Sequence, residues 1–391
     1  MIMEPKNWNV YLFRDILERV EVPVNVESNK EYVQIGIRSH GKGLFYKEPV
    51  LGKALGNKQV FWIQPNCFIL NVVFAWEQAI TKTTENEIGM IGSHRFPMYR
   101  PKNDLVDIDY LIYYFLTKRG TDILEAASPG GAGRNRTLGQ ERFLKSKITL
   151  PPLSEQQKIA AILSTQDKVI ELKEKLLAQK QQQKKYLMQQ LLTGKKRLPG
   201  FDRKWNYVKA NEIFKSIVDK SHGGKLEVLS STQDKGIVPR SQVDIDIKYN
   251  ENSLSTYKKV CEGDFVISLR SFQGGIEYSN YAGIVSPAYT VLRAIVKIDA
   301  GYYKQFFKSS NYIKRLNVAV YGIRDGKQIS YDDFGQIKIP VPPIEEQREV
   351  AKVLSTADHE IDLLQKSIEA EKQKKKALMQ LLLTGKVRVK I

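Results

Sequence analysis

Residues 148–197 read ITLPPLSEQQKIAAILSTQDKVIELKEKLLAQKQQQKKYLMQQLLTGKKR, and residues 339–388 read IPVPPIEEQREVAKVLSTADHEIDLLQKSIEAEKQKKKALMQLLLTGKVR. The two stretches align without a gap at a constant offset of 191 residues, and about half of their positions are identical. Self-similarity of this length identifies an internal repeat. The chain of 391 residues is therefore two copies of one unit, each a variable region followed by a near-constant segment.

Each near-constant segment is predicted to form one long helix. A pair of prolines opens it, at 151–152 and 342–343, and the acidic residues that follow suit the positive end of a helix. Gly194 and Gly385 stand where a helix C-terminus is expected. A helix over 154–192 would be roughly 58 Å long, too long to fold back on its own domain.

The apolar residues of both segments keep coiled-coil spacing, which indicates one narrow contact stripe on each helix. They are Ile159, Leu163, Ile170, Leu177, Leu187 and Leu191 in the first copy, and Val350, Leu354, Ile361, Leu364, Ile368, Leu378 and Leu382 in the second. The two helices are thus predicted to pair with each other, antiparallel and with pseudo-twofold symmetry. The stretches 180–185 and 371–376 are polar, so the stems of lysine and glutamine side chains are expected to cover the seam there.

The variable regions, 1–147 and 198–338, show a mixed pattern. Alternating β-rich runs at 32–37, 265–269 and 288–293 lie among glycine turns, and aromatic-rich helices are predicted at 110–117 and 302–309. The expected fold class is α+β. Two similar domains are separated by an antiparallel coiled coil of two long helices, with the helical regions at 148–197 and 339–391.

Basic residues are in excess. Lys and Arg number 61 against 43 Asp and Glu, a formal net charge of +18, which favours a polyanionic partner, nucleic acid above all. A generally basic protein without such a partner is the alternative. Cys67 and Cys261 lie in apolar runs and are predicted to be buried core thiols, as suits a reducing cytosol. The apolar stretch 60–76 contains polar residues and a proline and is interpreted as paired strands, and the N-terminus has no signal-peptide pattern, so a cytoplasmic location is expected.

No cofactor, metal or catalytic motif stands out. The phosphate-loop pattern G-x-x-x-x-G-K-[ST] is missing, and the glycines at 130–133 do not follow an apolar strand. His40, His94, His222 and His359 lack metal-ligand spacing. No catalytic, cofactor-binding or metal-binding residue is therefore predicted.

The variable regions contain clusters of side chains suited to base edges and phosphates. The candidate DNA-binding residues are Arg38, His40, Lys42, Ser93, His94, Arg95, Tyr99, Arg100, Arg134 and Arg136 in the first region, and Thr232, Gln233, Lys235, Arg240, Arg270, Ser271, Gln273, Tyr289, Arg293, Arg324, Lys327 and Gln328 in the second. A single cluster could be an ordinary solvated loop, and tyrosines such as Tyr99 and Tyr289 could equally be aromatics at the edge of the core. Several clusters at matching places in both halves favour DNA binding.

Three repeated motifs resemble a known family. They are P-P-x-x-E-Q at 151–156 and 342–347, L-S-T-x-D at 163–167 and 354–358, and L-M-Q-x-L-L-T-G-K at 187–195 and 378–386. Together with two divergent domains they are similar to the DNA-specificity subunit of type I restriction-modification enzymes, over essentially the whole chain. The stretches 36–45, 93–100 and 262–293 also look like parts of such recognition domains.

The resemblance implies that each variable region is a target-recognition domain reading one half of a bipartite double-stranded DNA site. It implies that the helices set the spacer and dock two methyltransferase (modification) subunits, with two restriction (motor-nuclease) subunits completing the enzyme. S-adenosylmethionine, ATP and Mg would then bind the partner subunits, and this chain would bind no cofactor and catalyse nothing.

Other hypotheses remain at this stage. The chain could be an enzyme with an unrecognised active site, although no carboxylate or histidine constellation supports one. It could instead be a coiled-coil adaptor, or a nucleic-acid-binding protein outside restriction-modification. DNA binding by the purified chain separates the adaptor from the specificity subunit, and turnover by the chain alone would reveal the enzyme.

Overall fold

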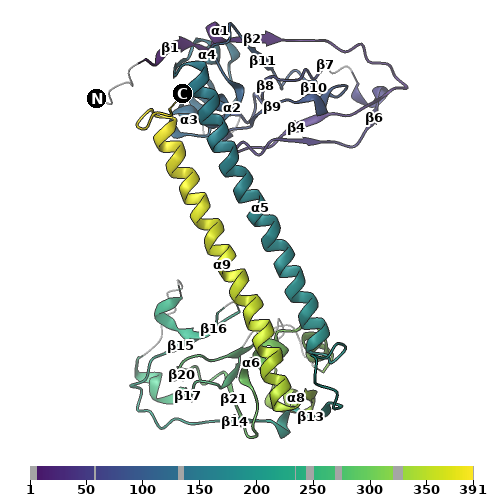
Figure 1. Cartoon of the computed structure of the whole chain (residues 1–391), viewed down its shortest axis with the longest axis vertical. Helices are drawn as coiled ribbons and strands as arrows, with labels where there is room; N and C mark the ends of the chain where they lie inside the picture. The colour runs from purple at the N-terminus through teal and green to yellow at the C-terminus, as the bar shows by residue number, and fades with distance from the viewer. Residues whose placement is uncertain are drawn as a thin grey trace. The chain divides into compact units, whose positions relative to one another are not determined.

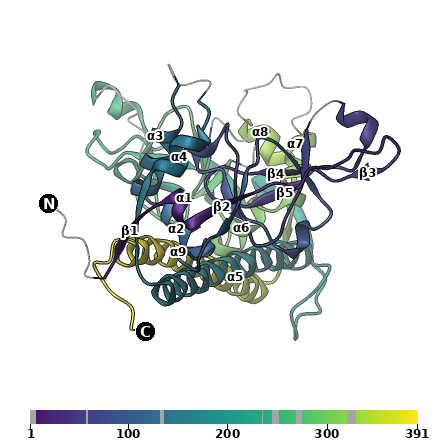
Figure 2. The same ribbon diagram turned by 90° about the horizontal axis from the view of Figure 1, so that it is seen from above.

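The computed structural model describes residues 7–56, 59–130, 136–233, 235–243, 251–268, 275–319 and 329–390, with the side chains of 251–253 and 319 excepted. The chain divides into two compact units (Figures 1 and 2). Unit 1 comprises residues 1–173 and 367–391, and unit 2 comprises residues 174–366. Each unit therefore combines one variable region with a segment of each long helix.

Unit 1 contains a four-stranded antiparallel sheet, three two-stranded ladders beside it, a β1–β12 pair and a group of short helices. The strands are β1 (Asn9–Leu12), β2 (Leu17–Val20), β3 (Glu31–Tyr32), β4 (Ile35–Ile37), β5 (Leu44–Tyr46), β6 (Val50–Leu51), β7 (Val60–Trp62), β8 (Phe68–Leu70), β9 (Ile80–Lys82), β10 (Ile91–Ser93), β11 (Met98–Pro101) and β12 (Lys147–Leu150). The helices are α1 (Phe13–Ile16), α2 (Ile108–Phe115), α3 (Lys118–Ala127) and α4 (Gln140–Lys145), with 3₁₀ turns η1 (Gly52–Leu55), η2 (Ala75–Glu77) and η3 (Glu85–Glu87).

Unit 2 has the same kinds of element in the same general order. Its strands are β13 (Asn206–Lys209), β14 (Phe214–Ile217), β15 (Leu229–Thr232), β16 (Gly236–Pro239), β17 (Lys258–Val260), β18 (Phe265–Ile267), β19 (Ile276–Tyr278), β20 (Gly283–Val285), β21 (Thr290–Ala294) and β22 (Lys338–Val341). Its helices are α6 (Ala300–Phe307), α7 (Ser310–Ala319) and α8 (Tyr331–Gln336), with 3₁₀ turns η4 (Ala210–Glu212), η5 (Arg240–Gln242) and η6 (Glu251–Thr256).

The two four-stranded sheets have matching topology. The strand order is β2-β11-β8-β9 in unit 1 and β14-β21-β18-β19 in unit 2. In each unit the first strand of the variable region pairs with the strand that precedes a long helix. β1 pairs with β12, and β13 pairs with β22. The predicted fold class, two similar α+β domains with long paired helices, is confirmed.

Aromatic rings that pack against one another contribute to the core of each unit. In unit 1 the ring of Phe143 lies 4.7 Å from that of Phe13 and 5.9 Å from that of Phe115, measured between centroids. In unit 2 Phe214 has the same role, with its ring 5.5 Å from Phe265 and 5.6 Å from Phe307. These side chains are fully buried, so each unit has its own hydrophobic core.

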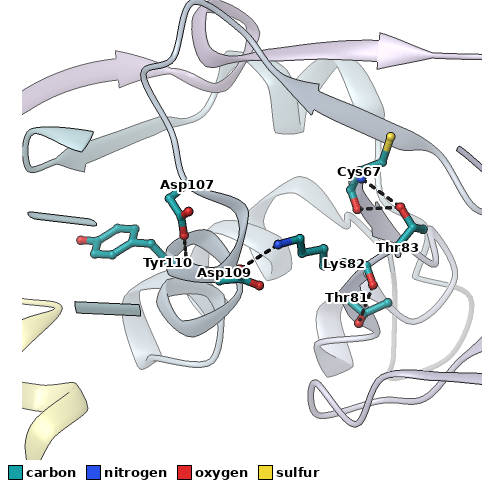
Figure 3. Close-up of polar contacts among 7 residues, drawn as sticks. All are labelled: Cys67, Thr81, Lys82, Thr83, Asp107, Asp109 and Tyr110. Atoms are coloured by element: carbon teal, nitrogen blue, oxygen red, sulfur yellow. Dashed lines mark hydrogen bonds and ion pairs between the residues drawn. The ribbon is translucent and has the colours of Figure 1, made fainter. Parts of the chain in front are cut away.

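The glutamine of the repeated E-Q motif ties each long helix to its variable region. Gln156 Oε1 accepts a 2.9 Å hydrogen bond from the amide of Asp107, and Gln347 Oε1 accepts one of the same length from Asp299. Asp107 caps α2, since its carboxylate accepts from the Tyr110 amide, as Figure 3 shows. The buried glutamine side chain thus accepts from the backbone N–H of the aspartate that caps a neighbouring helix. This hydrogen bond explains why the motif is kept in both copies.

A lysine brace fixes α2 against the sheet of unit 1. Lys82, at the end of β9, forms a 2.8 Å ion pair with Asp109 of α2 (Figure 3).

Cys67 lies directly before β8 and contacts Thr83, which directly follows β9. Its amide donates to Thr83 Oγ1 over 2.9 Å (Figure 3). Burial raises the pKa of the Cys67 thiol. Cys67 is buried, as predicted, whereas Cys261 is only half-buried, and neither forms a disulfide.

The two long helices are α5 (Leu153–Leu191) and α9 (Ile344–Leu382), each 39 residues long. In unit 1, Gln166 and Lys173 of α5 contact Glu371 of α9, and Asp167 pairs with Lys375 at 2.6 Å. Moving forward along α5 therefore means moving backward along α9, which makes the pair antiparallel.

Unit 2 repeats this arrangement. Lys180 pairs with Glu360 at 2.7 Å, and Lys184 pairs with Asp358. The Asp358–Lys184 pair occupies the repeat positions of Asp167–Lys375 in unit 1. Lys173, Lys184 and Lys375 are all half-buried. The prediction that lysine stems cover the polar middle of the seam is confirmed, whereas the glutamines at 181–183 and 373 are exposed.

Two local predictions differ from the structure. The run 60–76 forms strands β7 and β8 and the turn η2, but β7 pairs with β10, whereas β8 pairs with β9 and β11, so the strands are not partners of each other. The run 32–37 is two short strands, β3 and β4, that belong to separate ladders. Alternation in the sequence identifies strands, but it does not identify their partners.

Candidate nucleic-acid interface

One concave site in unit 1 brings together three of the predicted residues. Ser93, His94 and Arg95 lie in the turn between β10 and β11 and line a cavity of about 560 Å³. The turn is held by a 2.9 Å hydrogen bond from the Phe96 amide to the Ser93 carbonyl. The Arg95 carbonyl accepts from the Val72 amide at 3.0 Å, so the backbone is fixed while the His94 and Arg95 side chains are exposed.

Seven further residues line this cavity and were not predicted, among them Gln34, Lys47, Asn71 and Phe74. Phe74 is 45% exposed, so its ring is available to a ligand in this cavity. An exposed ring can stack on a base, the amides of Gln and Asn offer a donor beside an acceptor, and Arg offers paired donors. Because these residues come from separate segments of the chain, no single stretch of sequence indicated the group.

The loop between β4 and β5 carries Arg38, His40 and Lys42, all exposed. His40 has a positive φ of 60°, and its amide donates to the Glu77 carbonyl over 2.8 Å, so the loop rests on η2. The Arg38 guanidinium lies 5.2 Å from the centre of the Phe45 ring. The three side chains are open to solvent, and their contact with DNA stays a prediction.

Arg136 and Arg100 also remain candidates. The guanidinium of Arg136 lies 5.3 Å from the centre of the Trp76 ring, and Trp76 is anchored by a 3.0 Å hydrogen bond from its Nε1 to the Val73 carbonyl. Arg100 is exposed on β11. Both arginines could reach an anionic ligand, because neither forms an ion pair among the residues that the structure describes.

Tyr99 is a correction to the predicted site. Its side chain is completely buried, its hydroxyl donates to Gln140 at 3.1 Å, and Arg19 lies over its ring at 5.6 Å. The alternation of β11 turns Tyr99 into the core and Arg100 to the surface. Tyr99 is therefore a core residue and not a DNA contact.

The predicted residues of the β15–β16 hairpin in unit 2 are partly used to build the turn. Thr232 Oγ1 donates to the Gly236 carbonyl at 2.9 Å and accepts from the Lys235 amide at 3.1 Å. The Gln233 carbonyl accepts from Lys308 Nζ at 2.8 Å. The Gln233 and Lys235 side chains are exposed at the tip, whereas Arg240 Nε donates to Ser230 Oγ at 3.4 Å.

Arg293 has a structural partner, and its contact with DNA stays a prediction. Its Nε and Nη2 bind both oxygens of Asp264, at 2.8 and 2.6 Å, and the Asp264 side chain is 3% exposed. The hydrogen bonds to Asp264 raise the pKa of Arg293 above its ordinary value. Asp264 also accepts from the Cys261 amide at 2.8 Å. Arg293 thus neutralises a buried carboxylate that holds a turn, a structural role.

Tyr289 is half-buried against a small apolar cluster, and its carbonyl accepts from Lys258 Nζ at 2.6 Å. It belongs with the core-edge aromatics. The remaining candidates lie outside the described residues, so the structure places none of them: Arg134, Arg270, Ser271, Gln273, Arg324, Lys327 and Gln328.

Among the described residues, no group of three or more His, Cys, Asp and Glu is arranged to hold a metal ion. Within the same part of the chain, no helix is both long and apolar enough to cross a bilayer. The cavity lined by Ser93, His94 and Arg95 is therefore the candidate ligand site of unit 1. Two variable domains, each packed on the paired long helices, are the architecture of a two-domain binding protein.

Comparison with known proteins identifies the family. Residues 25–181 and 202–372 each match the type I restriction modification DNA specificity domain. The MjaVIII specificity subunit of a type I restriction enzyme from Methanocaldococcus jannaschii is 26% identical over 426 residues, which cover 99% of this chain and 94% of that protein. The chain belongs to the family of type I restriction-modification DNA-specificity proteins, with two copies of the domain.

Solved structures agree on the fold. A structure of the HsdS subunit from Thermoanaerobacter tengcongensis matches with a TM-score of 0.55 at 20% identity and covers 98% of both chains. A chain from a structure on complex assembly and conformational transition of the type I restriction-modification system matches with a TM-score of 0.60 at 20% identity, covering 98% of this chain and all of that one. At such identities the likeness concerns the fold.

Proposed function

We propose that this chain is the DNA-binding specificity subunit of a type I restriction-modification enzyme and that each variable region reads one half of a bipartite DNA target. The observation that carries the proposal in unit 1 is the concave site, where Gln34, Asn71 and Arg95 meet beside the exposed ring of Phe74. Amide and guanidinium groups in one pocket can form the paired hydrogen bonds that distinguish bases. The two matched domains support two half-sites.

The domain boundaries proposed for this function are 1–147 and 198–338 for recognition, and 148–197 and 339–391 for the helical regions. In this proposal the chain is not an enzyme and works in the cytoplasm with two modification and two restriction subunits. S-adenosylmethionine, ATP and Mg would bind those partners. The role of the family as the specificity component supports this division of labour.

The proposal is tested by selection from a random duplex library with the assembled modification enzyme, followed by methylation of the selected duplexes. The expected result is two short specific sequences whose centres lie about 10 bp apart, one turn of B-DNA, with an unread spacer between them. A continuous recognition sequence would contradict the proposal that each variable region reads one half of the target. Absence of any selected sequence would reject the specificity role itself.

Substituting Arg95 with alanine is expected to weaken recognition of one half-site only. If Arg95 makes a bidentate base contact, the loss should be about 1–3 kcal/mol against the cognate base, with the other half-site unaffected. Competition binding with duplexes altered at one half-site at a time measures this. Arg14→Ala is the matched control, because its side chain is 56% exposed and lies outside the pocket.

An equal loss on all sequences would reassign Arg95 to phosphate binding. Gln34→Ala is a second test of the same pocket. It removes an uncharged side chain, so its effect does not come from a lost phosphate charge contact. The two variants should relax specificity at the same half-site if the pocket acts as a unit.

Lengthening α5 is expected to lengthen the preferred spacer. Four residues inserted before Gly194 add about 6 Å to the helix, and DNA advances about 3.4 Å per base pair. The optimum should therefore grow by about 1–2 bp, while the half-site sequences stay the same because the recognition loops are unchanged. Methylation of duplexes that differ only in spacer length measures the shift, and an unchanged optimum with retained activity would show that the helices do not set distance.

A further inference from the structure

The cavity lined by Ser93, His94 and Arg95 offers hydrogen-bond donors to a ligand, while most of its acceptors are already used. No aspartate or glutamate is among the ten described residues that line it. The backbone carbonyls of six lining residues accept hydrogen bonds from within unit 1: Gln34, Asn71, Val73, Phe74, Ser93 and Arg95. A ligand therefore meets mainly the polar side chains of the lining, and their donors and acceptors decide what it can be.

Asn71 is held in one orientation between β8 and η2. Its backbone N–H donates to the Ala79 carbonyl at 2.9 Å, and its side-chain Oδ1 accepts from the Val73 amide at 3.0 Å. A backbone N–H can only donate, so the atom of the Asn71 side chain that faces it must be the oxygen. Nδ2 forms no hydrogen bond within the described part of the chain, which leaves its two N–H donors as the free polar groups of this half-buried lining residue.

Three neighbouring side chains add donors. Ser93 Oγ accepts from the Arg95 amide at 3.3 Å, which leaves the Ser93 hydroxyl hydrogen free to donate. Lys47 and Arg95 are exposed, carry donors only, and form no ion pair among the described residues. Because charged donors form the stronger hydrogen bonds, the lining favours a ligand that presents acceptors side by side.

Gln34 and His94 do not change this bias. The half-buried Gln34 side chain carries a donor and an acceptor and forms no hydrogen bond to a described residue, so it can turn either group to the ligand. A neutral histidine likewise offers one donor and one acceptor. Selection therefore falls to the groups whose donor character is fixed, above all Asn71.

Among the four bases, guanine matches this set of donors best. Its major-groove edge presents two acceptors, N7 and O6, and no donor. Adenine and cytosine place an amino group there, which would meet the donors of Asn71, and thymine has one acceptor beside a methyl group. Arginine and lysine also form their commonest specific contact with guanine.

The apolar part of the lining separates a base from a phosphate. Phe74 is 45% exposed, and Ile35, Val73 and Phe96 complete the lining. A phosphate accepts hydrogen bonds too, but neighbouring apolar side chains cost it hydration. A base, by contrast, packs favourably on an aromatic ring. Donors beside an available ring therefore favour a base.

We propose that the cavity of unit 1 selects a guanine through its major-groove edge, with Asn71 as a specificity-determining residue that donates from Nδ2 and Arg95 as the second donor. This inference rests on the proposed function, because it takes the cavity to read a base. It adds the identity of that base and the residue that rejects the alternatives.

Asn71→Asp tests the proposal with almost no change of shape. The carboxylate keeps an oxygen for the Val73 amide and replaces the Nδ2 donors with an acceptor. Selection from a random duplex library is run with the assembled modification enzyme, wild type and variant. The wild type is expected to require guanine at one position of the half-site that Arg95→Ala weakens. The variant should lose that preference, by about 5- to 150-fold in relative affinity, and should favour cytosine there, whose amino group donates to a carboxylate.

Asn103→Asp is the matched control, because it adds the same charge at an exposed position outside the cavity. The backbone of Asn103 has a positive φ of 56°, which aspartate tolerates as asparagine does. The control should leave every base preference unchanged. If Asn71→Asp instead weakened binding to all sequences equally, the cavity would be a phosphate site and the proposal would be overturned.

Altered bases test the contact with the protein intact. Replacing the selected guanine with 7-deazaguanine removes N7, so wild-type affinity should fall at least about fivefold, whereas Asn71→Asp should bind both duplexes within about twofold. Hypoxanthine keeps N7 and O6 and lacks only the amino group in the minor groove, so the wild type should bind it within about twofold of guanine. Unchanged wild-type affinity for the 7-deazaguanine duplex, or a large loss with hypoxanthine, would overturn the proposal.

The outcomes separate this inference from the proposed function. A wild-type enzyme that selects two half-sites without guanine at the position altered by Asn71→Asp would overturn the guanine contact and leave the specificity role standing. The same holds if Asn71→Asp alters no position. Selection of no sequence at all would overturn both, because the cavity would then have no base to read.

Discussion

The affinity of the assembled modification enzyme for its DNA target is expected to fall by about three to five orders of magnitude when the salt concentration rises from about 50 to 200 mM. The reason is counterion release: a protein that neutralises about 6–10 phosphates loses that much affinity over this range. The formal net charge of +18 on this chain, and exposed basic residues such as Arg38 and Lys42, provide the charge for such contacts.

The measurement is a plot of log affinity against log salt, for a duplex with the selected target and for one without it. Both should show steep slopes, because phosphate contacts do not depend on sequence, and the gap between them should persist. Arg95→Ala should narrow that gap more than it changes the slope if it reads a base. A flat response would mean that the basic surplus does not serve DNA phosphates.

Removing Arg388 is expected to destabilise the start of α5 strongly. Glu155, in the first turn of that helix, is completely buried, and its two oxygens accept from Arg388 Nε and Nη2, each at 2.6 Å. The hydrogen bonds to Glu155 raise the pKa of Arg388. Removing one partner of a fully buried pair costs about 3–5 kcal/mol, because it leaves an uncompensated buried charge. The Arg388 side chain is 37% exposed, so water offsets part of the loss and the expected cost is about 3 kcal/mol or less. Arg388→Ala should therefore be among the most damaging substitutions outside the aromatic cores.

Unit 2 supplies a matched comparison. Arg197 binds Glu346 in the same way, at 2.6 Å to each oxygen, but Glu346 also accepts a 2.8 Å hydrogen bond from Trp205 Nε1. In unit 1 the corresponding Nε1, that of Trp8, is buried without a hydrogen-bond partner in the described structure. Arg197→Ala should therefore cost less than Arg388→Ala, because one donor to the carboxylate remains.

Hydrogen exchange distinguishes the two variants by place. Arg388→Ala should lower protection in the first turns of α5, and Arg197→Ala should do so in the first turns of α9, since local openings report local stability. Lys386→Ala and Arg203→Ala, both at exposed positions, are the controls. Equal protection in variants and controls would show that these pairs contribute little. Arg388→Lys should give an intermediate loss, because it keeps the charge but not the two-point contact.

The long helices are the part of the fold that the sequence predicted best. α5 and α9 begin directly after the proline pairs at 151–152 and 342–343, and they end shortly before the glycines at 194 and 385. Both glycines have the positive φ that is typical of a helix C-terminus, 69° and 68°. Coiled-coil spacing is a local property of the chain, and so are caps and stops. The aromatic-rich helices were also placed within two residues, at α2 and α6.

The candidate site was predicted only in part. Ser93, His94 and Arg95 were found because polar residues cluster there in the sequence. Gln34 and Asn71 were missed because the fold brings them to the same cavity from distant segments. The sequence suggested a DNA contact for Tyr99, which its complete burial excludes. It did not indicate that Arg293 pairs with the buried Asp264.

By itself, the sequence determined that this protein is a duplicated unit, that its halves are joined by two paired helices, and that it carries a surplus of positive charge for an anionic partner. Repeat, period and charge are properties of residues in order. Only the tertiary structure decided which polar side chains are exposed to a ligand and which are buried in the core or paired with a buried group. The physical reason is that strand register and helix packing bring together residues far apart in the chain, and the resulting burial then sets what each side chain can bind.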